Sequence, residues 1–412
     1  MLSDGRVWLV VLFGLGLMRM ATADQWKITG ALDQGFEYND NIGLRVDKTP
    51  AFGYLLRPSV KAEWNTALMK VGISGSGDIR RYDDTQWNCD NFTLGADQSY
   101  TQRRHVFSLN AGYSQICSYA QQASDTGILV PNNQSESLNL SPNWSWQVTQ
   151  LDRLSLSPSY SQTSFNDFGT GNNNEISNNF RDNTSYSVNL SELHEWTRRF
   201  SSNASIFFSH SEFSSSGNAF NQGTSSQIVF GGQLGGQYAI TRKWSINAGA
   251  GGRWVQSPGA SASGGSGDLL FGETFNVAIN YKGKFDTFAV NFSRSVSPSA
   301  FGQIQDVSSF GMQYGYEISR ELSFKASGNY SENQAVGQSQ TQLEQKLSFY
   351  NASAELAWKF AREWRLTASY RYQMQDLAAD GAQISSFLSG VRDSNAVMIH
   401  LNYNWDGLRD SR

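Results

Sequence analysis

Side-chain polarity alternates with a period of two residues along most of the chain, and this pattern constrains the fold more than any other feature. Near the C-terminus, the apolar side chains of this pattern are Val397, Ile399, Leu401, Tyr403 and Trp405. Successive side chains of a β-strand point to opposite faces, so a period of two indicates a strand with one apolar and one mostly polar face. Similar runs occur at 54–64, 138–146, 244–250, 275–281, 310–318, 322–326 and 364–372. The sequence therefore predicts an all-β fold.

The length and low charge of these runs favour a membrane barrel over a soluble sandwich. Charged residues make up 17% of the chain and aromatic residues 13%. The polar face of a soluble sandwich meets water and is expected to carry more charge, on shorter runs. A wall that is apolar outside and polar inside is typical of a transmembrane β-barrel, which leaves no unpaired backbone in lipid.

The breaks between the runs are of two kinds that alternate along the chain. Tight, mostly charged breaks lie at 65–66, 101–104, 149–153, 197–199, 241–243, 282–284, 319–321 and 361–363. Long breaks rich in Gly, Ser and Asn lie at 39–50, 121–133, 167–182, 256–268, 331–341 and 377–393. Short periplasmic turns and long extracellular loops alternate in this way in outer-membrane barrels.

The runs and breaks together predict an antiparallel up-and-down barrel. We expect about 18 strands, within a range of about 16 to 20, with both ends of the barrel chain in the periplasm. Tryptophans beside the short breaks are expected to form an interfacial girdle. These tryptophans are Trp64, Trp196, Trp244, Trp358, Trp364 and Trp405.

The first 23 residues have the features of a signal peptide. Arg6 precedes an apolar run at 7–17, and Ala21-Thr22-Ala23 precedes Asp24. The apolar run is shorter than the roughly 20 residues that a spanning helix needs. We therefore predict a signal peptide at 1–23 and a single outer-membrane barrel domain at 24–412, because no Pro-rich or charge-rich linker divides the rest of the chain.

Charge and motif content argue against nucleic-acid binding and against catalysis. The net charge is −4, with 32 basic and 36 acidic residues spread along the chain, so no basic stripe offers a site for nucleic acid. The four histidines, which lie at 105, 194, 210 and 400, are far apart. Ser209 and Ser211 flank His210, but side chains of adjacent strand residues point to opposite faces. We predict no enzymatic activity, no cofactor and no metal site.

The two cysteines, Cys89 and Cys117, flank one predicted hairpin centred near residues 102–103. The periplasm is oxidising, which favours a disulfide. The alternation does not place both thiols on one face, so bonding requires a bulge or a position of Cys89 already in the loop. The sequence leaves the bond open.

The polar positions of the runs predict the residues that line the lumen. They carry both signs of charge with Ser and Asn between them, and about 18 strands enclose an aqueous bore unless loops plug it. Mixed charge suits a hydrated, hydrogen-bonding solute such as sugar, or simply pairs across strands. The candidate lumen residues are Lys27, Asp33, Glu37, Arg57, Lys61, Glu63, Arg80, Asp97, Arg253, Glu317, Lys325, Glu355, Lys359, Arg365 and Arg371.

The first predicted hairpin carries two short motifs that resemble a known family. They are Gly35-Phe36-Glu37-Tyr38-Asn39-Asp40-Asn41-Ile42 and Leu56-Arg57-Pro58-Ser59-Val60. The hairpin resembles the β-barrel porin type 2 family, which includes outer-membrane proteins associated with exopolysaccharide and PEP-CTERM gene clusters. The similarity extends over the mature chain as architecture. One departure is that the chain continues past Trp405 to Arg412, whereas many barrels end on an aromatic residue.

The resemblance implies an outer-membrane channel that exports a secreted exopolysaccharide. The expected partners are outer-membrane lipid, the polysaccharide cargo and a periplasmic polysaccharide-export protein. Two alternatives remain: a general or sugar-selective diffusion porin, and a non-conducting structural or adhesion barrel. An outer-membrane hydrolase is the last alternative.

Overall fold

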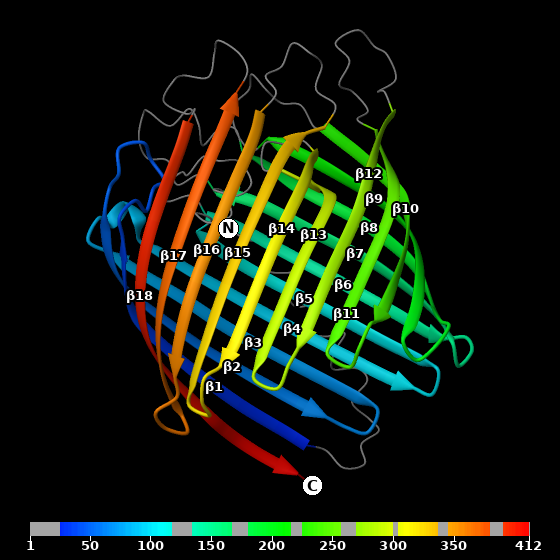
Figure 1. Cartoon of the computed structure of the whole chain (residues 1–412), viewed down its shortest axis with the longest axis horizontal. Coiled ribbons are helices and arrows are strands. Elements are labelled where there is room, and N and C mark those ends of the chain that lie inside the picture. Colours follow the sequence, from blue (N-terminus) through cyan, green and yellow to red (C-terminus); the bar gives the residue numbers. More distant parts are fainter. Residues whose placement is uncertain are drawn as a thin grey trace.

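The strands of the computed structural model close into a single antiparallel barrel. The structure describes residues 25–117, 134–166, 180–215, 225–256, 269–299, 304–336, 345–379 and 390–411. Each strand pairs with its neighbours in sequence, and β1 pairs with β18 to close the 18-stranded sheet (Figure 1). The predicted all-β, up-and-down barrel is confirmed, and so is the strand number. The predicted signal peptide at 1–23 lies outside the described residues.

The strands are 13 to 22 residues long. In the first half of the chain they are β1 (Gln25–Asn39), β2 (Ala51–Asn65), β3 (Met69–Tyr82), β4 (Cys89–Gln102), β5 (His105–Cys117), β6 (Gln134–Gln147), β7 (Asp152–Asn166), β8 (Arg181–Glu195) and β9 (Phe200–Ser215). In the second half they are β10 (Ser225–Ala239), β11 (Trp244–Gln256), β12 (Leu269–Lys282), β13 (Asp286–Pro298), β14 (Ile304–Glu317), β15 (Leu322–Ala335), β16 (Gln345–Trp358), β17 (Trp364–Ala379) and β18 (Gly390–Ser411). The described residues contain one short helix, η1 (Thr85–Trp87), and no helix long and apolar enough to span a membrane.

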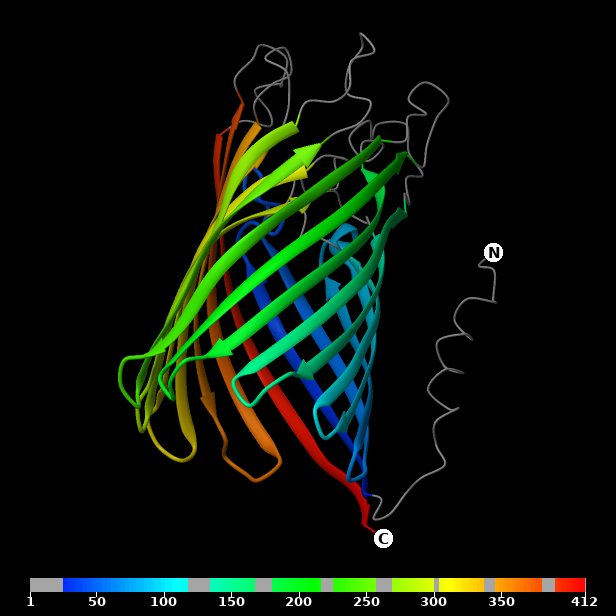
Figure 2. The ribbon, with the colours of Figure 1, turned by 90° about the vertical axis from the view of Figure 1, so that its right-hand side faces the viewer.

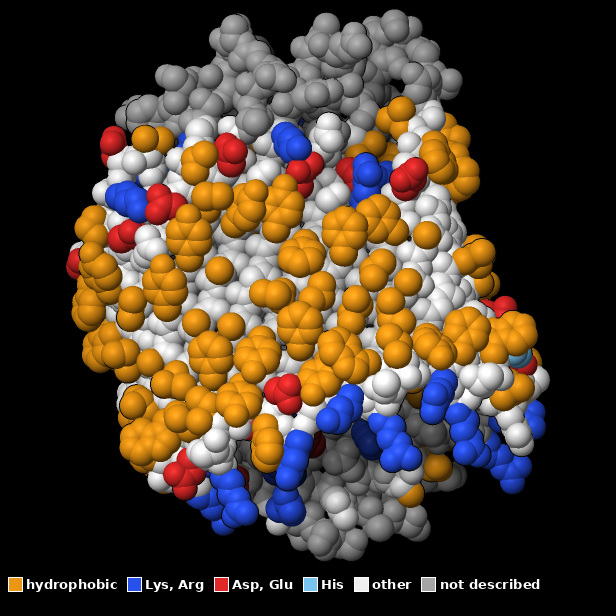
Figure 3. Space-filling view, in the orientation of Figure 1, with side chains coloured by type: hydrophobic (Ala, Val, Ile, Leu, Met, Phe, Trp, Pro, Cys, Tyr) orange, Lys and Arg blue, Asp and Glu red, His pale blue; other side chains and the backbone are white. Residues whose placement is uncertain are grey.

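The outer surface of the barrel carries a broad apolar belt (Figure 3). Its side chains come from one face of each strand and are exposed, as Phe36, Ile73, Ile206, Leu234 and Ile399 illustrate. Large apolar side chains are rarely left exposed in such number on a soluble protein. The belt is the surface that a transmembrane barrel presents to lipid.

All eight predicted short connections occur, and they lie at one end of the barrel, where the described chain also begins and ends (Figure 2). Five of them share a local sequence rule. A Thr or Ser hydroxyl accepts a hydrogen bond, 2.9–3.1 Å long, from the backbone N–H three residues later. Such side-chain bonds to the backbone favour tight turns. The five hydroxyl groups belong to Thr66, Thr149, Thr197, Thr241 and Ser319.

The opposite end of the barrel carries the long connections, of which 40–50 and 83–88 are described in full. The predicted loop at 121–133 and most of those at 167–182 and 256–268 lie outside the described residues. The predicted loops at 331–341 and 377–393 are too long, because 331–335, 377–379 and 390–393 belong to strands. These strand ends rise above the apolar belt, where an outward-facing side chain can be polar and alternation no longer marks a strand. The connection at 83–88, which contains η1, was not predicted.

The predicted tryptophan girdle is present at the turn end. Trp64, Trp196, Trp244, Trp358 and Trp364 each lie within one residue of a strand end that meets a short turn, while Trp405 pairs with Gly30. His105 adds to this girdle by stacking with Trp144 and Trp146.

The C-terminal extension past Trp405 is part of the barrel closure. A register shift between Ile28 and Gly30 marks a bulge in the β1–β18 pair, after which Leu408 pairs with Ile28 and Ser411 pairs with Gln25. Gly407 lies opposite this shift with a φ of +79°, a conformation that favours glycine. The extension therefore continues the closing strand.

Candidate functional site

The polar inner wall is the candidate functional site. Glu37 shows which side of the strands faces the inside of the barrel. The Glu37 carboxylate contacts Tyr82 on β3 and Arg371 on β17, and neither strand is adjacent to β1, so the three side chains meet inside the barrel. Strand register places 14 of the 15 candidate lumen residues on this face. The exception is Lys359, which lies in the turn after β16. That these residues line a path for a solute stays a prediction.

Glu37 is the most deeply buried acid of the inner wall, with 1% of its surface exposed. Its Oε1 accepts a hydrogen bond from Arg371 Nη2 at 2.8 Å, and its Oε2 accepts one from the Tyr82 hydroxyl at 3.0 Å. A buried carboxylate needs such partners, because its desolvation would otherwise be costly. This cluster links β1 to β3 and to β17.

A second chain of ion pairs runs beside the first. Asp78 accepts hydrogen bonds from Arg80 at 2.7–3.2 Å and meets Arg57 Nε at 3.2 Å. Arg57 also approaches Asp33 at 3.6 Å, and Asp33 approaches His400 Nδ1 at 3.4 Å. The charges on this part of the wall therefore compensate one another.

Three members of these networks, Asp78, Tyr82 and His400, were not predicted from the sequence. The outer face of β3 carries Gly75 and Gly77 instead of large apolar residues, so its alternation was weak and Asp78 and Tyr82 were missed. His400 was visible as a polar position of the last run. Its proximity to Asp33 depends on the pairing of the first and last strands.

The inner wall from β5 to β9 is mostly uncharged and rich in hydroxyl and amide groups. Side chains on neighbouring strands bind one another, as in the pairs Ser137–Thr163, Asn143–Ser157, Ser159–Ser187 and Ser185–Ser211, at 2.5–3.1 Å. The wall therefore has a charged side, around β1–β4 and β17–β18, and a neutral side. Such hydroxyl and amide groups both donate and accept hydrogen bonds.

Two connections fold inward and narrow the extracellular mouth. Leu44, from the connection at 40–50, is buried against Phe349 on β16. Trp87, from η1, is buried with Ala51 and Tyr82, and the Arg45 guanidinium lies 5.9 Å from the centre of the Trp87 ring. Both connections therefore pack on the inner wall.

Ionic contacts also hold the connection at 40–50. Lys48 Nζ lies 2.6 Å from Asp393 and 3.2 Å from Asp40. Burial acts to raise the pKa of the Asp40 carboxyl, but hydrogen bonds from Asn395 and Lys48 outweigh it and lower that pKa below its ordinary value. The hydrogen bond to Asp393 raises the pKa of Lys48.

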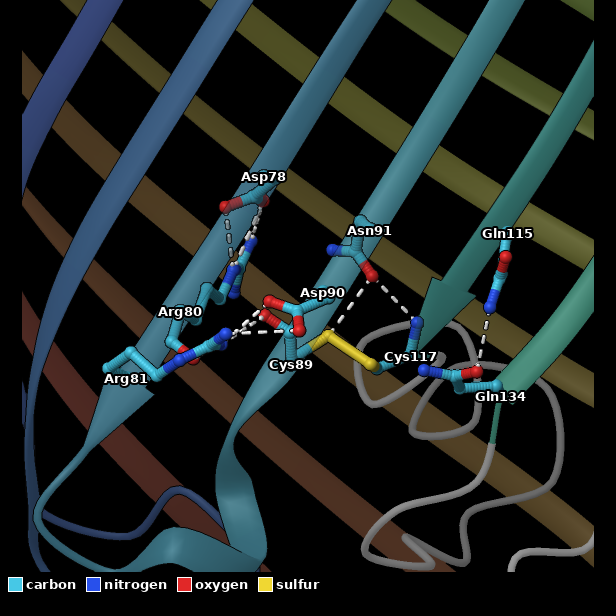
Figure 4. Close-up of a disulfide and its surroundings, with 9 residues drawn as sticks. All are labelled: Asp78, Arg80, Arg81, Cys89, Asp90, Asn91, Gln115, Cys117 and Gln134. Carbon is cyan, nitrogen blue, oxygen red and sulfur yellow. Dashed lines mark hydrogen bonds and ion pairs between the residues drawn. A yellow bond between two sulfur atoms is a disulfide. The ribbon is translucent and has the colours of Figure 1, made fainter.

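Cys89 and Cys117 form a disulfide at the extracellular ends of β4 and β5 (Figure 4). The β4–β5 ladder stops at the pair of Phe92 and Gln115, and beyond it the side-chain oxygen of Asn91 accepts a hydrogen bond from the Cys117 N–H at 2.7 Å. The end of the ladder frees the two cysteines from strict alternation. The disulfide therefore forms although alternation along the strands does not place both thiols on one face.

A cavity of about 860 Å³ lies at the turn end of the barrel. It is lined by strands and turns from β10 to β16, and its charged lining residues are Arg242, Lys243, Lys282, Lys325 and Glu355. Lys325 and Glu355 approach each other at 3.8 Å. The charged lining of this cavity is therefore mostly cationic.

The described residues contain no group of three or more His, Cys, Asp or Glu side chains placed to hold a metal ion. On β9, Ser211 lies on the inner face and its hydroxyl contacts that of Ser185, whereas His210 belongs to the opposite face. The Ser211 hydroxyl and the His210 ring therefore do not form a serine–histidine pair.

No protein-family model and no curated protein matches the sequence. Among solved structures, the FrpB iron transporter from Neisseria meningitidis (F5-1 variant) is 8% identical, with 92% of this chain and 82% of that chain covered and a TM-score of 0.50. OpdQ from Pseudomonas aeruginosa is 12% identical, with 92% of this chain and 98% of that chain covered and a TM-score of 0.45. At these identities the likeness concerns the fold alone.

The closed 18-stranded sheet, the apolar outer belt and the polar inner wall together define the class of protein. It is an outer-membrane β-barrel.

Proposed function

We propose that the barrel is a channel for a hydrated, largely neutral carbohydrate, and that it serves the export of an exopolysaccharide. The uncharged hydroxyl and amide wall of β5–β9 carries this proposal. A sugar presents hydroxyl groups that donate and accept hydrogen bonds, and this wall offers the same groups in return. A pore selective for ions would carry a ring of one charge sign.

The opposite wall supports the same proposal because many of its charges are paired. Glu37 is compensated by Arg371, Asp78 by Arg57 and Arg80, and Glu63 by Lys61 at 2.6 Å. Paired charges keep a wall hydrated without attracting one sign of ion. A neutral polymer can therefore pass along the neutral and the charged side of the lumen without being held strongly by charge.

The direction of transport and the partner belong to the proposal. The packed mouth, with Leu44 and Trp87 buried in it, favours a regulated passage over free diffusion. The periplasmic rim carries Arg198, Arg199 and other cations of the adjoining turns, which suits an acidic surface of a periplasmic polysaccharide-export protein. Outer-membrane lipid is the remaining partner, and it covers the apolar belt.

The first test is deletion of the gene in its native host, with extracellular polysaccharide measured against a complemented strain. If the deletion strain loses extracellular polysaccharide and the wild-type gene restores it, the result supports export. Unchanged polysaccharide contradicts export. A purified barrel that then admits small sugars into liposomes would instead be a sugar-selective porin, and one that admits none would be a structural barrel.

A blocking experiment tests whether the lumen itself carries the cargo. The two native cysteines are bonded to each other, so Ser159→Cys adds a single free thiol to the neutral inner wall. Attachment of a bulky maleimide there should reduce sugar entry into liposomes. Leu151→Cys, in a periplasmic turn, is the matched control and should leave sugar entry unchanged after labelling. Equal sugar entry through both labelled variants would contradict transport along this wall.

A further inference from the structure

The barrel wall has a seam between β12 and β13. These strands share eight residue pairs, from Phe275–Arg294 to Lys282–Thr287, whereas β11 and β12 share 13. Above Phe275, residues 269–274 of β12 have no partners on β13, and the two strands separate (Figure 1). An unpaired strand edge is costly in lipid unless something covers it.

The seam exists because the ends of β13 and β14 bend into the barrel. Val296 and Ile304 belong by register to the outer face of their strands. They nevertheless pack against Phe213, Val229 and Val255, which lie on the inner face of β9–β11. The inward bend therefore fills an apolar patch of the inner wall with side chains that alternation would direct toward lipid.

Apolar surface continues around the free edge of β12. Leu269 and Phe271 are exposed on the outer face, by 53% and 63%, and Phe271 packs edge-on against Trp254 of the belt. Leu270, on the inner face, is also exposed by 36%. An apolar path thus leads from the belt, past this edge, toward the inner patch.

A cationic pair lies at the inner end of this path. Arg253 is 2% exposed, and its Nη2 contacts Asp306 Oδ2 at 2.8 Å. Arg294 Nη2 reaches the same oxygen at 2.8 Å. Arg253 Nε and Asp306 Oδ1 have no hydrogen-bond partner in the described part of the chain. The carboxylate thus holds two guanidinium groups together and leaves hydrogen-bonding capacity unused.

Gly272 leaves room for the Arg253 side chain to reach Asp306. A Cβ atom at position 272 would collide with the Arg253 guanidinium. The glycine therefore lets Arg253, on β11, cross the backbone of β12 to reach Asp306 on β14.

We propose that the seam admits a single-chain anionic amphiphile from the outer leaflet and that this molecule binds at Arg253. Its carboxylate or phosphate head takes the place of Asp306 between Arg253 and Arg294. Its chain takes the place of Val296 and Ile304 on the inner apolar patch. Guanidinium groups bind both head groups through charge-assisted hydrogen bonds. This proposal does not rest on carbohydrate transport, although Arg253 and Phe213 belong to the inner wall of the barrel.

The test uses the full barrel in neutral maltoside micelles and dodecanoate with a photoactivatable diazirine at the chain end. We expect saturable labelling of segments around Phe213, Val229 and Val255, which unlabelled dodecanoate suppresses and extra dodecyl maltoside does not. Suppression by dodecyl phosphate as well would extend the head group to phosphate, and failure of that competitor would restrict it to carboxylate. Labelling spread evenly around the outer belt would overturn the proposal.

Two substitutions with opposite expected effects separate binding from loss of structure. Arg253→Gln should weaken dodecanoate binding about tenfold or more, because a charge-assisted hydrogen bond is lost. Asp306→Asn should strengthen it, because the competing carboxylate is gone. Arg365→Gln, on the inner face of β17, is the control and should not change binding. A purely structural role of the ion pair would move the first two variants in the same direction, and that result would overturn the proposal.

Discussion

Glu37 and Arg371 belong to strands that do not touch in the sheet, and they meet at 2.8 Å across β18. Glu37 is held from the other side by Tyr82. The contact joins the two ends of the chain inside the barrel, close to the mouth that the connection at 40–50 narrows. The contact therefore connects β1 with β17 on the inner wall, across the closing strand β18.

Arg371→Leu should destabilise the barrel by about 3 kcal/mol, because it leaves the Glu37 carboxylate buried without its cation. Denaturant unfolding in detergent, followed by heat-modifiable mobility, measures the effect. Arg365→Leu removes an exposed arginine from the inner face of the same strand, one without an ion pair in the described residues, and should cost less than about 0.5 kcal/mol. Equal costs would contradict the assigned role of Arg371.

Replacing both Cys89 and Cys117 by Ser should lower stability by about 3 to 4 kcal/mol. The bond closes a loop with a sequence separation of 28, and its loss releases the unfolded chain from that constraint. Thermal melting in detergent, with and without reductant, provides the measurement. The reduced wild type should melt with the double variant, and unchanged melting in both would argue against the constraint.

Gly407→Val should weaken barrel closure. A Cβ at this position would collide with the Ile28 carbonyl, and the φ of +79° disfavours a β-branched residue. We expect loss of the folded, heat-modifiable form at a lower temperature than in the wild type. Gly328→Val serves as the control, since a Cβ there meets nothing within 4 Å. Similar melting of both variants would show that the bulge does not support closure.

Acidic pH should loosen the connection at 40–50. The pKa of Asp40 is lowered in the folded protein, so its stabilising contribution is present above its ordinary value of 3.8 and is lost as the pH falls through the lower folded value. Protonation removes the carboxylate that binds Lys48.

Conductance in planar bilayers should therefore rise as the pH falls below 3.8, the ordinary Asp value. Asp40→Asn should show the higher conductance at neutral pH already. A flat pH profile in the wild type, or a variant that conducts like the wild type at neutral pH, would contradict this role of Asp40.

The local and periodic features of this protein follow from its amino-acid sequence alone. Alternating polarity specified the strands and their apolar face, because side chains of a strand alternate and lipid demands one apolar side. Tight, mostly charged breaks specified the short connections, at which the structure adds a turn-forming hydroxyl group such as that of Thr241. Both depend on residues close together in the chain, and they were sufficient to predict the strand number and 14 positions of the inner wall.

Which residues meet from distant parts of the chain depends on how the barrel closes and how its strands bend. The Cys89–Cys117 bond, the pairing of Glu37 with Arg371 and the contact of Leu44 with Phe349 depend on where ladders end and which strands become neighbours. The seam beside β12 goes against the alternation rule, because Val296 points by register toward lipid and is buried inside. Periodicity assigns a side chain to a face of its strand. The bend of that strand in space then decides what the face contacts.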